Sequence, residues 1–363
     1  MPKKVVKSQK PKTIPEGTLR ISSKDLTVSE KTKSGWKKSD RNFPNAVHVI
    51  DLFKAHDNFD ILTDKKNPKW LKGQVSPEGK LQGARINVLP DGRQLDKAFS
   101  LFAEELTIHD ATTNDHWDVL YRNPGGTYSY VYTLEKDAKT RSKKYKAVGE
   151  FEMVYPILIE NVRKALFDEK DDMAVPMYTL LKTLMRIGNE IYFKAHGHKG
   201  LTTLKKKDVT IRGKHVTFKY LAKNCVPSTT TRKFPEIYVD RLSKRLSKIK
   251  MSDFVFANTE TGHPLSESAF KHAFARYCGE EFYPHIVRSY YGTKRAEDFL
   301  RNNKAATKKE VRRFFLSVAD KLNHKRFVKK KGIWTESWTV TANHYIRPEL
   351  VEKIKNLPAR KKR

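Results

Sequence analysis

The sequence predicts an α+β protein of two domains, and three observations support this prediction. Between about Phe43 and Thr140, short apolar runs alternate with turn signals such as the Pro-Glu-Gly at 77–79, a pattern typical of short strands and helices. Beyond residue 150, apolar residues recur at the three- and four-residue spacing of buried helix faces. The chain has 363 residues, more than the roughly 250 that one hydrophobic core usually serves.

In the first half of the chain we expect three segments. Residues 1–40 are rich in Lys, Ser and Thr and lack apolar periodicity, which predicts a basic flexible arm. Residues 41–140 are predicted to form a small N-terminal domain of α+β type, with a strand over 128–134. Residues 136–149 carry six Lys or Arg in fourteen positions and are predicted to be a basic linker, on the side that faces a polyanionic partner.

The second half, residues 141–363, is predicted to be a mainly helical domain that contains one β-hairpin. Two β-rich runs, 209–212 and 215–220, flank Gly213-Lys214 and predict the hairpin. Helical spacing of apolar residues extends over 151–167, 173–194, 236–249, 266–277, 284–302, 308–322 and 348–355.

The charge of the chain indicates a polyanionic partner. Lys and Arg number 73 against 41 Asp and Glu, a formal charge of +32, and the basic runs at 3–12 and 360–363 are typical of nucleic-acid contacts. No apolar run is long enough to span a membrane or serve as a signal peptide, so we expect no membrane partner and an intracellular location, in the cytoplasm, nucleoid or nucleus. Cys225 and Cys278 lack the spacing of a zinc site or a disulfide framework, and no metal or other cofactor is expected.

A specific motif pair lies in the second half. The run 186–190 reads Arg-Ile-Gly-Asn-Glu and the run 200–204 reads Gly-Leu-Thr-Thr-Leu. Together these runs resemble the signatures of type IB DNA topoisomerases, particularly of small viral, bacterial or archaeal enzymes. The resemblance covers about residues 140–355, and the run 110–119 looks like a segment of that family's N-terminal domain. It implies a two-domain clamp around DNA, in which residues 41–140 are the N-terminal DNA-binding domain and residues 141–363 the catalytic domain. It also implies that Arg186 is a cation on the scissile phosphate.

The resemblance implies further site residues. Lys223 ends a run, 218–223, that is similar to the family's Phe-x-Phe-x-Gly-Lys, with Ala222 in place of glycine, and it would be the general acid. His285-Ile-Val-Arg288 resembles the His/Lys-x-x-Arg pattern that the family shares with tyrosine recombinases, so Arg288 would be the second arginine and His285 a possible additional site residue. A plain phosphate contact for Lys223, and a capping or core role for His285, remain alternatives.

Two more residues complete the implied site. His324 follows a run similar to Val-Ala-x-x-Leu-Gly-His, with Asn323 at the glycine position, where a left-handed helix end is expected. Tyr345 lies in Tyr-Ile-Arg-Pro, which resembles the frame of the family's nucleophile. A neutral phenol is a poor nucleophile, but neighbouring guanidinium groups favour the phenolate during attack. Twenty-one positions separate His324 from Tyr345, and the insert 325–338 is either a short linker over DNA or an exposed loop.

The resemblance thus implies a monomeric enzyme that relaxes supercoiled double-stranded DNA without ATP or metal. The transient single-strand break would carry a 3′-phosphotyrosine, and religation would reverse the same steps. A site-specific tyrosine recombinase is the main alternative, because it shares the same constellation. A non-catalytic DNA-binding protein is a further alternative.

Overall fold

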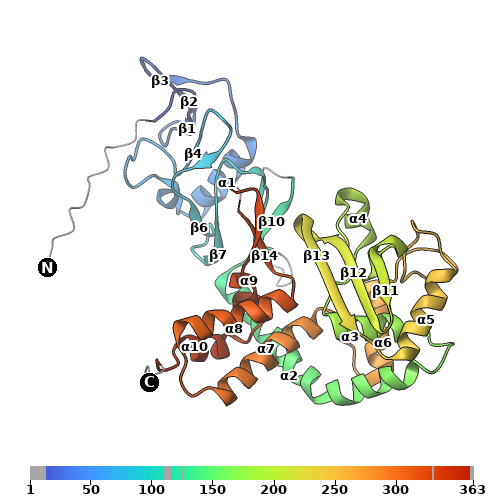
Figure 1. Cartoon of the computed structure of the whole chain (residues 1–363). Helices are drawn as coiled ribbons and strands as arrows, with labels where there is room; N and C mark the ends of the chain where they lie inside the picture. Colours follow the sequence, from blue (N-terminus) through green and yellow to red (C-terminus); the bar gives the residue numbers. More distant parts are fainter. Residues whose placement is uncertain (1–13, 110–116, 124–125, 329–330, 360–363) are drawn as a thin grey trace. The chain divides into compact units, whose positions relative to one another are not determined.

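The computed structural model describes residues 14–109, 117–123, 126–328 and 331–359. The basic runs at 3–12 and 360–363, and most of the run 110–119, lie outside the described residues. The chain divides into two compact units, residues 1–142 and 143–363 (Figure 1). The first unit is built on antiparallel sheets and the second is mainly helical with small sheets, which confirms the α+β prediction.

The described residues of the first unit form three sheets. A five-stranded sheet has the order β3-β2-β1-β4-β5, a two-stranded sheet pairs β6 with β7, and a three-stranded sheet has the order β10-β9-β8. The elements are β1 (Leu19–Ile21), β2 (Val28–Thr32), β3 (Gly35–Lys38), α1 (Pro44–Ala55), the short helix Phe59–Leu62, β4 (Gln74–Val75), β5 (Leu81–Gln82), β6 (Ile86–Val88), β7 (Gln94–Phe99), β8 (Glu104–Ile108), β9 (Val119–Arg122) and β10 (Tyr128–Val131).

The strands β1 to β3 lie inside residues 1–40, so the expectation of a flexible arm does not hold for residues 19–38. Leu19 and Ile21 are buried, and they pack in the same core as Phe53 of α1 and Phe99 of β7. The apolar positions are few and widely spaced among lysines, so the sequence periodicity was weak. Burial against α1 supplies the stabilisation that a composition of Lys, Ser and Thr does not indicate.

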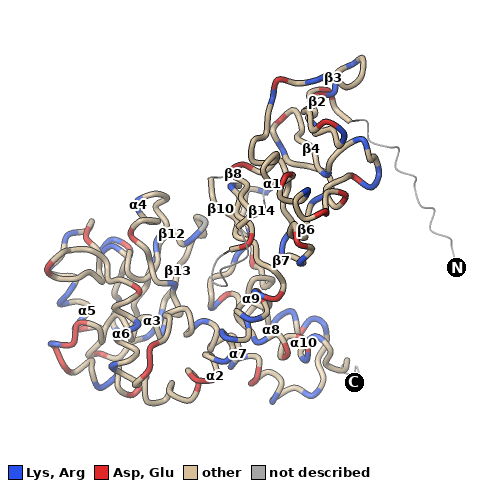
Figure 2. The backbone as a smooth tube through the Cα atoms, turned by 180° about the vertical axis from the view of Figure 1, so that it is seen from behind, with Lys and Arg blue, Asp and Glu red and all other residues tan. Residues whose placement is uncertain are grey.

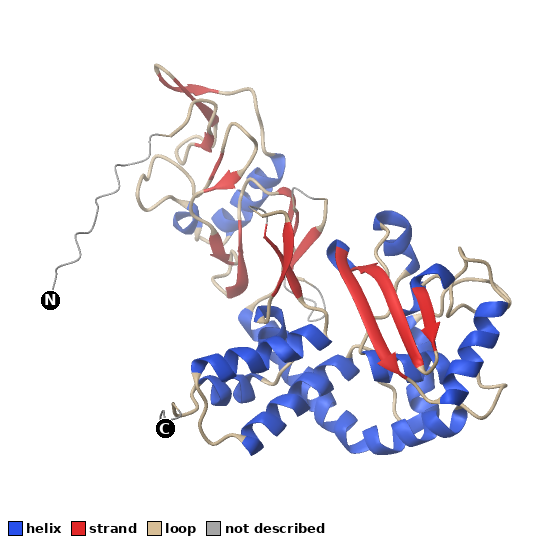
Figure 3. Ribbon diagram, in the orientation of Figure 1, coloured by secondary structure: helices blue, strands red, loops and turns tan. Residues whose placement is uncertain are grey.

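The second unit places a three-stranded sheet, in the order β11-β12-β13, beside a group of helices (Figure 3). Its elements are the greater part of α2 (Leu134–Ala165), which begins in the first unit, and α3 (Ala174–Thr183), α4 (Glu190–His196), β11 (Val209–Arg212), β12 (His215–Ala222), β13 (Val226–Lys233), α5 (Glu236–Ser247), α6 (Glu267–Cys278), α7 (Ile286–Asn302), α8 (Lys308–Lys321), β14 (Lys325–Val328), β15 (Ile333–Glu336), α9 (Thr339–His344) and α10 (Pro348–Lys355), with short 3-10 turns at Leu201–Thr203, Lys206–Asp208 and Lys223–Cys225.

Several helix ends follow from local sequence. Thr307 caps α8 and exchanges hydrogen bonds with Glu310, the reciprocal pair of a capping box. Ser266 caps α6, which ends at Gly279 in the left-handed conformation. Pro348 begins α10, where its missing N–H costs nothing. These signals explain why the predicted bounds of α6, α8 and α10 agree closely with the structure.

The predicted hairpin 209–220 is present as β11 and β12, and the structure adds β13 as a third strand. The insert 325–338 is a second hairpin, β14 and β15, in which the Phe327 and Trp334 rings lie 5.3 Å apart. Residues 136–149 are not a linker in conformation, because they form the first half of α2. Their Lys, Arg and Ala are good helix formers, and Tyr145 and Val148 are buried on one side of that helix.

The predicted helix 173–194 is also interrupted. α3 ends at Thr183, and Leu184 takes a left-handed conformation with φ of 59° before the chain resumes helix at Glu190. The residues between, 184–189, carry Arg186 out of the helix. Leu184 and Met185 are buried in the same core as α3, so the helical spacing of apolar residues continues past Thr183. The sequence pattern therefore did not reveal that the helix is interrupted there.

Lysine and arginine positions are spread along both units (Figure 2). Within the described part of the chain, no helix is both long enough and apolar enough to cross a membrane.

Candidate active site

Tyr345 directly follows the last residue of α9, three positions before α10 begins at Pro348, and its side chain is buried. Its backbone N–H donates to the Thr341 carbonyl at 2.9 Å, which closes the last turn of α9. α7 approaches the Tyr345 backbone closely at Gly292. A Cβ added to Gly292 would lie 2.3 Å from the Tyr345 carbonyl oxygen, so only glycine permits this approach. The position of Tyr345 is therefore set by α7 as well as by its own helix.

Cationic groups surround the Tyr345 ring. Arg186 donates a hydrogen bond of 2.6 Å from Nη2 to the Tyr345 hydroxyl oxygen. The guanidinium carbon of Arg288 lies 5.1 Å from the ring centroid, and the Lys144 Nζ lies 5.4 Å from it. Positive charge at these positions stabilises negative charge on the phenolic oxygen and on any anion bound beside it.

The two motif runs around Arg186 form one compact turn. The Leu201 N–H donates to the Arg186 carbonyl at 2.8 Å, and the Thr202 hydroxyl donates to the Gly188 carbonyl at 3.0 Å. Gly200 touches this turn so closely that a Cβ there would lie 2.6 Å from the Arg186 carbonyl oxygen. The spacing of the two runs thus has a physical cause, because each run supplies the hydrogen-bond partners that hold Arg186 outside a helix.

Arg288, on the first turn of α7, is buried and held by backbone. Its Nη1 donates to the Leu184 carbonyl, and its Nη2 donates to the Leu322 carbonyl at 2.8 Å. Its Nε has no hydrogen-bond partner among the described residues. Burial lowers the pKa of Arg288 to about 10, and the charge of Arg186 acts in the same direction. The group is still protonated at neutral pH, so Arg288 is a buried cation that keeps one unused hydrogen-bond donor.

His324 connects Arg288 to α9. Its Nε2 lies 3.1 Å from the Arg288 Nη2, and its Nδ1 lies 2.7 Å from the Thr341 hydroxyl. A guanidinium only donates, so Nε2 must accept and the proton of the neutral ring belongs on Nδ1. Burial, and then the charges of Arg288 and Arg186, lower the pKa of His324 to about 3. His324 is neutral at physiological pH in this structure.

Asn323, just before His324, has φ of 53°, which confirms the expected left-handed end of α8. His285 lies at the start of α7, with its ring 5.2 Å from that of Tyr345. Crowding of the ring by protein, and then the charges of Arg288 and Arg186, lower the pKa of His285 to about 2, although part of its side chain reaches solvent. His285 is therefore a neutral neighbour of the phenol.

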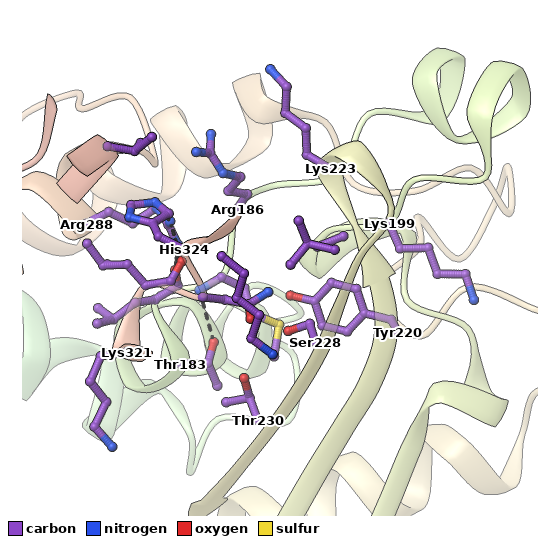
Figure 4. Close-up of a pocket in the computed structure, with 18 of the residues that line it drawn as sticks. Thr183, Arg186, Lys199, Tyr220, Lys223, Ser228, Thr230, Arg288, Lys321 and His324 are labelled. Carbon is purple, nitrogen blue, oxygen red and sulfur yellow. Dashed lines mark hydrogen bonds between the residues drawn. The ribbon is translucent and has the colours of Figure 1, made fainter. Parts of the chain in front are cut away.

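Lys223 stands apart from this cluster. It lies in the turn between β12 and β13, its side chain is exposed, and in Figure 4 its amine points away from Arg288 and His324. The structure thus brings Arg186, Arg288, His324 and Tyr345 together and leaves the amine of Lys223 outside their contacts.

A pocket of about 290 Å³ opens beside this cluster (Figure 4). Arg186, Arg288 and His324 line one side, and residues of the β11–β13 sheet line the other. Its lining consists of Thr183, Leu184, Met185, Arg186, Lys199, Tyr220, Ala222, Lys223, Val226, Ser228, Thr230, Arg288, Lys321, Leu322, Asn323, His324, Lys325, Ser337 and Val340. A phosphodiester beside the pocket would meet several cations at once, which suits the stabilisation of a charged transition state.

Sequence reasoning missed three residues of this region: Lys144, Thr341 and Lys199. Lys144 donates to the His344 carbonyl besides lying near the Tyr345 ring, yet in the sequence it was one lysine in a basic run. Thr341 orients His324. Lys199 forms an ion pair with Asp208 (2.6 Å), in which both side chains are largely buried. Only Lys199 had a signal, since it directly precedes the Gly-Leu-Thr-Thr-Leu run.

Among the described residues, no group of three or more His, Cys, Asp or Glu could hold a metal ion. The titratable groups that do gather are the arginines, histidines and tyrosine of the cluster.

Residues 135–348 match the family of the eukaryotic DNA topoisomerase I catalytic core. This chain belongs to that family. The match spans more than half of the chain and contains all six residues that the sequence analysis assigned to the site, which confirms the family resemblance seen in the motif runs.

Two solved structures of the XerH site-specific recombinase are also similar to the chain. The post-cleavage complex with a palindromic difH substrate is 17% identical, with a TM-score of 0.35 over 55% of this chain and 50% of the recombinase. The pre-cleavage complex with difH is 16% identical, with a TM-score of 0.32 over 47% and 44%. This chain therefore matches about half the length of the recombinase or less. No match was found among curated proteins.

Proposed function

We propose that this topoisomerase I family member relaxes supercoiled double-stranded DNA as a monomer, by transient cleavage of one strand. The observation that carries the proposal is the hydrogen bond of 2.6 Å between Arg186 and the hydroxyl of the buried Tyr345. A buried phenol that accepts from a guanidinium is prepared for attack, because the cation stabilises the phenolate as it forms. The family match and the charge of +32 point to DNA as the substrate.

In the proposed reaction, the Tyr345 oxygen attacks the scissile phosphorus and the bond from phosphorus to the 5′-oxygen breaks. The phenol proton leaves to solvent or to a neighbouring base, and Lys223 donates a proton to the departing 5′-oxygen. Arg186, Arg288 and His324 stabilise the charge on the non-bridging oxygens. The 3′-phosphotyrosine conserves the energy of the broken bond, so religation reverses the same steps after the strand has rotated and needs no ATP.

For His324 to donate a hydrogen bond to the phosphate, its ring must carry a proton on Nε2. Its Nε2 now accepts from Arg288, so it has no proton there to donate to phosphate. An anionic phosphate beside Arg288 would draw away the guanidinium donor and favour a proton on Nε2. We propose that DNA binding itself converts His324 into a donor.

The test is a plasmid relaxation assay in chelator without ATP, with purified protein at low concentration and a plasmid that carries no paired sites. We expect relaxation, and a covalent protein–DNA adduct after rapid denaturation. Tyr345→Phe should bind duplex DNA with little change and form no adduct. If wild type fails to relax the plasmid but joins two copies of a specific site, the protein is a recombinase. If it binds DNA and does neither, it is a non-catalytic binding protein.

A further inference from the structure

A second pocket, also of about 290 Å³, lies in the mainly helical unit between α2, α3, β13, α7 and the end of α8. It shares Leu184 and Lys321 with the first pocket but contains none of the proposed site residues. Its lining consists of Tyr155, Leu181, Lys182, Leu184, Arg232, Val287, Tyr290, Tyr291, Lys294, Arg295 and Lys321. The volume is near the lower end of small-molecule sites, so part of a larger ligand would extend into solvent.

The charge of this pocket is one-sided. Five of its lining residues are Lys or Arg, and none of them is Asp or Glu. Lys294 is neutralised by Glu152, with 2.5 Å between Nζ and Oε1. In the described part of the chain, Lys182, Arg295 and Lys321 have no ion-pair partner. Several unpaired cations around one cavity favour a ligand with more than one negative charge, such as a chain of phosphates.

The same pocket offers aromatic surface. The rings of Tyr155 and Tyr290 lie 4.7 Å apart and at 40° to each other, and Tyr291 is half-buried on the next position of α7. Burial raises the pKa of all three phenols, so they stay neutral and present uncharged faces and hydroxyl donors. Leu181, Leu184 and Val287 complete an apolar wall. Aromatic and apolar walls beside cations suit a flat base that carries phosphates.

We propose that this second pocket binds a nucleoside triphosphate, with the base against the tyrosines and the phosphates among Lys182, Arg232, Arg295 and Lys321. The proposal goes beyond DNA relaxation, because the nucleotide is a ligand of a separate site and not an energy source.

The pocket lies beside the residues that hold Arg288, so a ligand bound there could affect the proposed active site. Leu184 supplies the carbonyl that accepts from Arg288 Nη1, and Leu322, next to Lys321, supplies the carbonyl that accepts from Nη2. Val287 precedes Arg288 on α7. A polyanion in the pocket would lower the positive potential around Arg288 and shift the backbone that holds it. We therefore propose also that the nucleotide slows DNA cleavage.

Binding can be measured without DNA, by calorimetry with ATP in chelator, so that the result does not depend on topoisomerase activity. The double variant Lys182→Gln with Arg295→Gln should weaken ATP binding by about tenfold or more, because two charge-assisted contacts are lost. The matched control, Lys309→Gln with Arg312→Gln, removes the same charge from exposed positions of α8 outside the pocket and should leave ATP affinity within about twofold. Equal losses in the two variants would mean that ATP binds the basic surface generally, and the proposal would fail.

A separate control tests whether the base of the nucleotide contacts the tyrosines of the pocket. Tripolyphosphate carries the phosphates without a base, and it should bind about tenfold more weakly than ATP, because stacking on an aromatic side chain is lost. Equal affinity for the two ligands would overturn the assignment to a nucleotide.

The effect on cleavage is measured in a single turnover, with enzyme and DNA mixed at saturating enzyme concentration and ATP added in chelator. ATP should slow cleavage about fivefold or more in wild type and in the Lys309→Gln, Arg312→Gln control, and much less in the Lys182→Gln, Arg295→Gln variant. If all three proteins slow equally, ATP competes with DNA in general. If ATP binds but does not slow wild type, the regulatory part of the proposal is wrong.

Discussion

Arg186 and Tyr345 are 159 positions apart in the sequence, and the structure joins them by a hydrogen bond of 2.6 Å from Nη2 to the phenolic oxygen. The contact depends on the interruption after α3, which brings Arg186 out of the helix, and on the close approach of α7 to the Tyr345 backbone at Gly292. Both partners are partly or fully buried, so the interaction is weakly screened by solvent.

Arg186→Gln should therefore slow single-turnover cleavage by about 10²–10³-fold, the loss typical of removing one preorganised donor from a developing charge. Arg186→Lys should recover only part of the rate, since an ammonium does not reproduce the planar fork of a guanidinium. Arg313→Gln, an equal loss of charge on the exposed face of α8, is the control and should cleave almost normally. Rates within threefold of wild type for Arg186→Gln would remove Arg186 from the proposed site.

A glycine substitution tests the approach of α7 to Tyr345. Gly292→Ala places a Cβ 2.3 Å from the Tyr345 carbonyl oxygen, so the backbone must shift and take the phenol with it. We expect a cost of about 1–3 kcal/mol in unfolding free energy. Cleavage should fall by about 100-fold, because small misplacements of reacting groups are costly.

Gly149→Ala is the matched control, since it also lies inside a helix but its Cβ would meet only the Arg347 side chain at 4.0 Å. It should stabilise the protein by up to about 1 kcal/mol and leave cleavage unchanged. Normal cleavage by a folded Gly292→Ala would show that the close approach is not needed to position Tyr345.

The lowered pKa of His324 predicts a pH dependence of stability. The folded chain keeps His324 neutral down to a pKa of about 3, whereas a histidine in the unfolded chain has a pKa near 6.5. Between these values the unfolded chain binds a proton that the folded chain does not, so stability falls as pH falls below about 6.5. One such group contributes at most about 1.4 kcal/mol per pH unit.

Urea unfolding at pH 7 and pH 5 measures this contribution as a difference between proteins. Wild type should lose more stability between these two values than His324→Gln, in which the titrating group is absent. The other histidines and the carboxyl groups are common to both proteins and cancel. An equal loss in the two would mean that His324 is not held neutral by its surroundings.

The proposed role of Lys223 as general acid can be tested by changing the leaving group, the 5′-oxygen of the scissile phosphate. Lys223→Ala should slow cleavage by about 10²–10⁴-fold if the amine donates the proton to the 5′-oxygen. Because the amine points away from Arg288 and His324, this role requires the β12–β13 turn to move when DNA binds. A substrate with sulfur at the 5′-bridging position should restore much of the rate, since a thiolate leaves without protonation.

Arg288→Ala serves as the comparison and should gain little from sulfur, because its proposed task is to stabilise the non-bridging oxygens. Equal responses of the Lys223 and Arg288 variants would mean that the acid is another group, with Lys219 on β12 the next candidate.

The sequence by itself determined the fold class, most helix bounds of the second unit, the β11–β12 hairpin and the family. These features depend on short-range patterns: apolar spacing along one helix, caps such as Thr307 with Glu310, and motif runs such as 186–190. It also identified the four residues that the structure brings together, because each one lies in a recognisable run.

Only the tertiary structure decided how those residues meet. The break after α3, the neutral state of His324, the place of Lys144 beside Tyr345 and the distance of Lys223 from the cluster all depend on partners far away in the chain. The physical reason is that periodicity reports whether a residue is buried but not against which backbone. The sequence around Arg288 accordingly does not indicate whether its guanidinium faces solvent or donates, as it does here, to the carbonyls of Leu184 and Leu322.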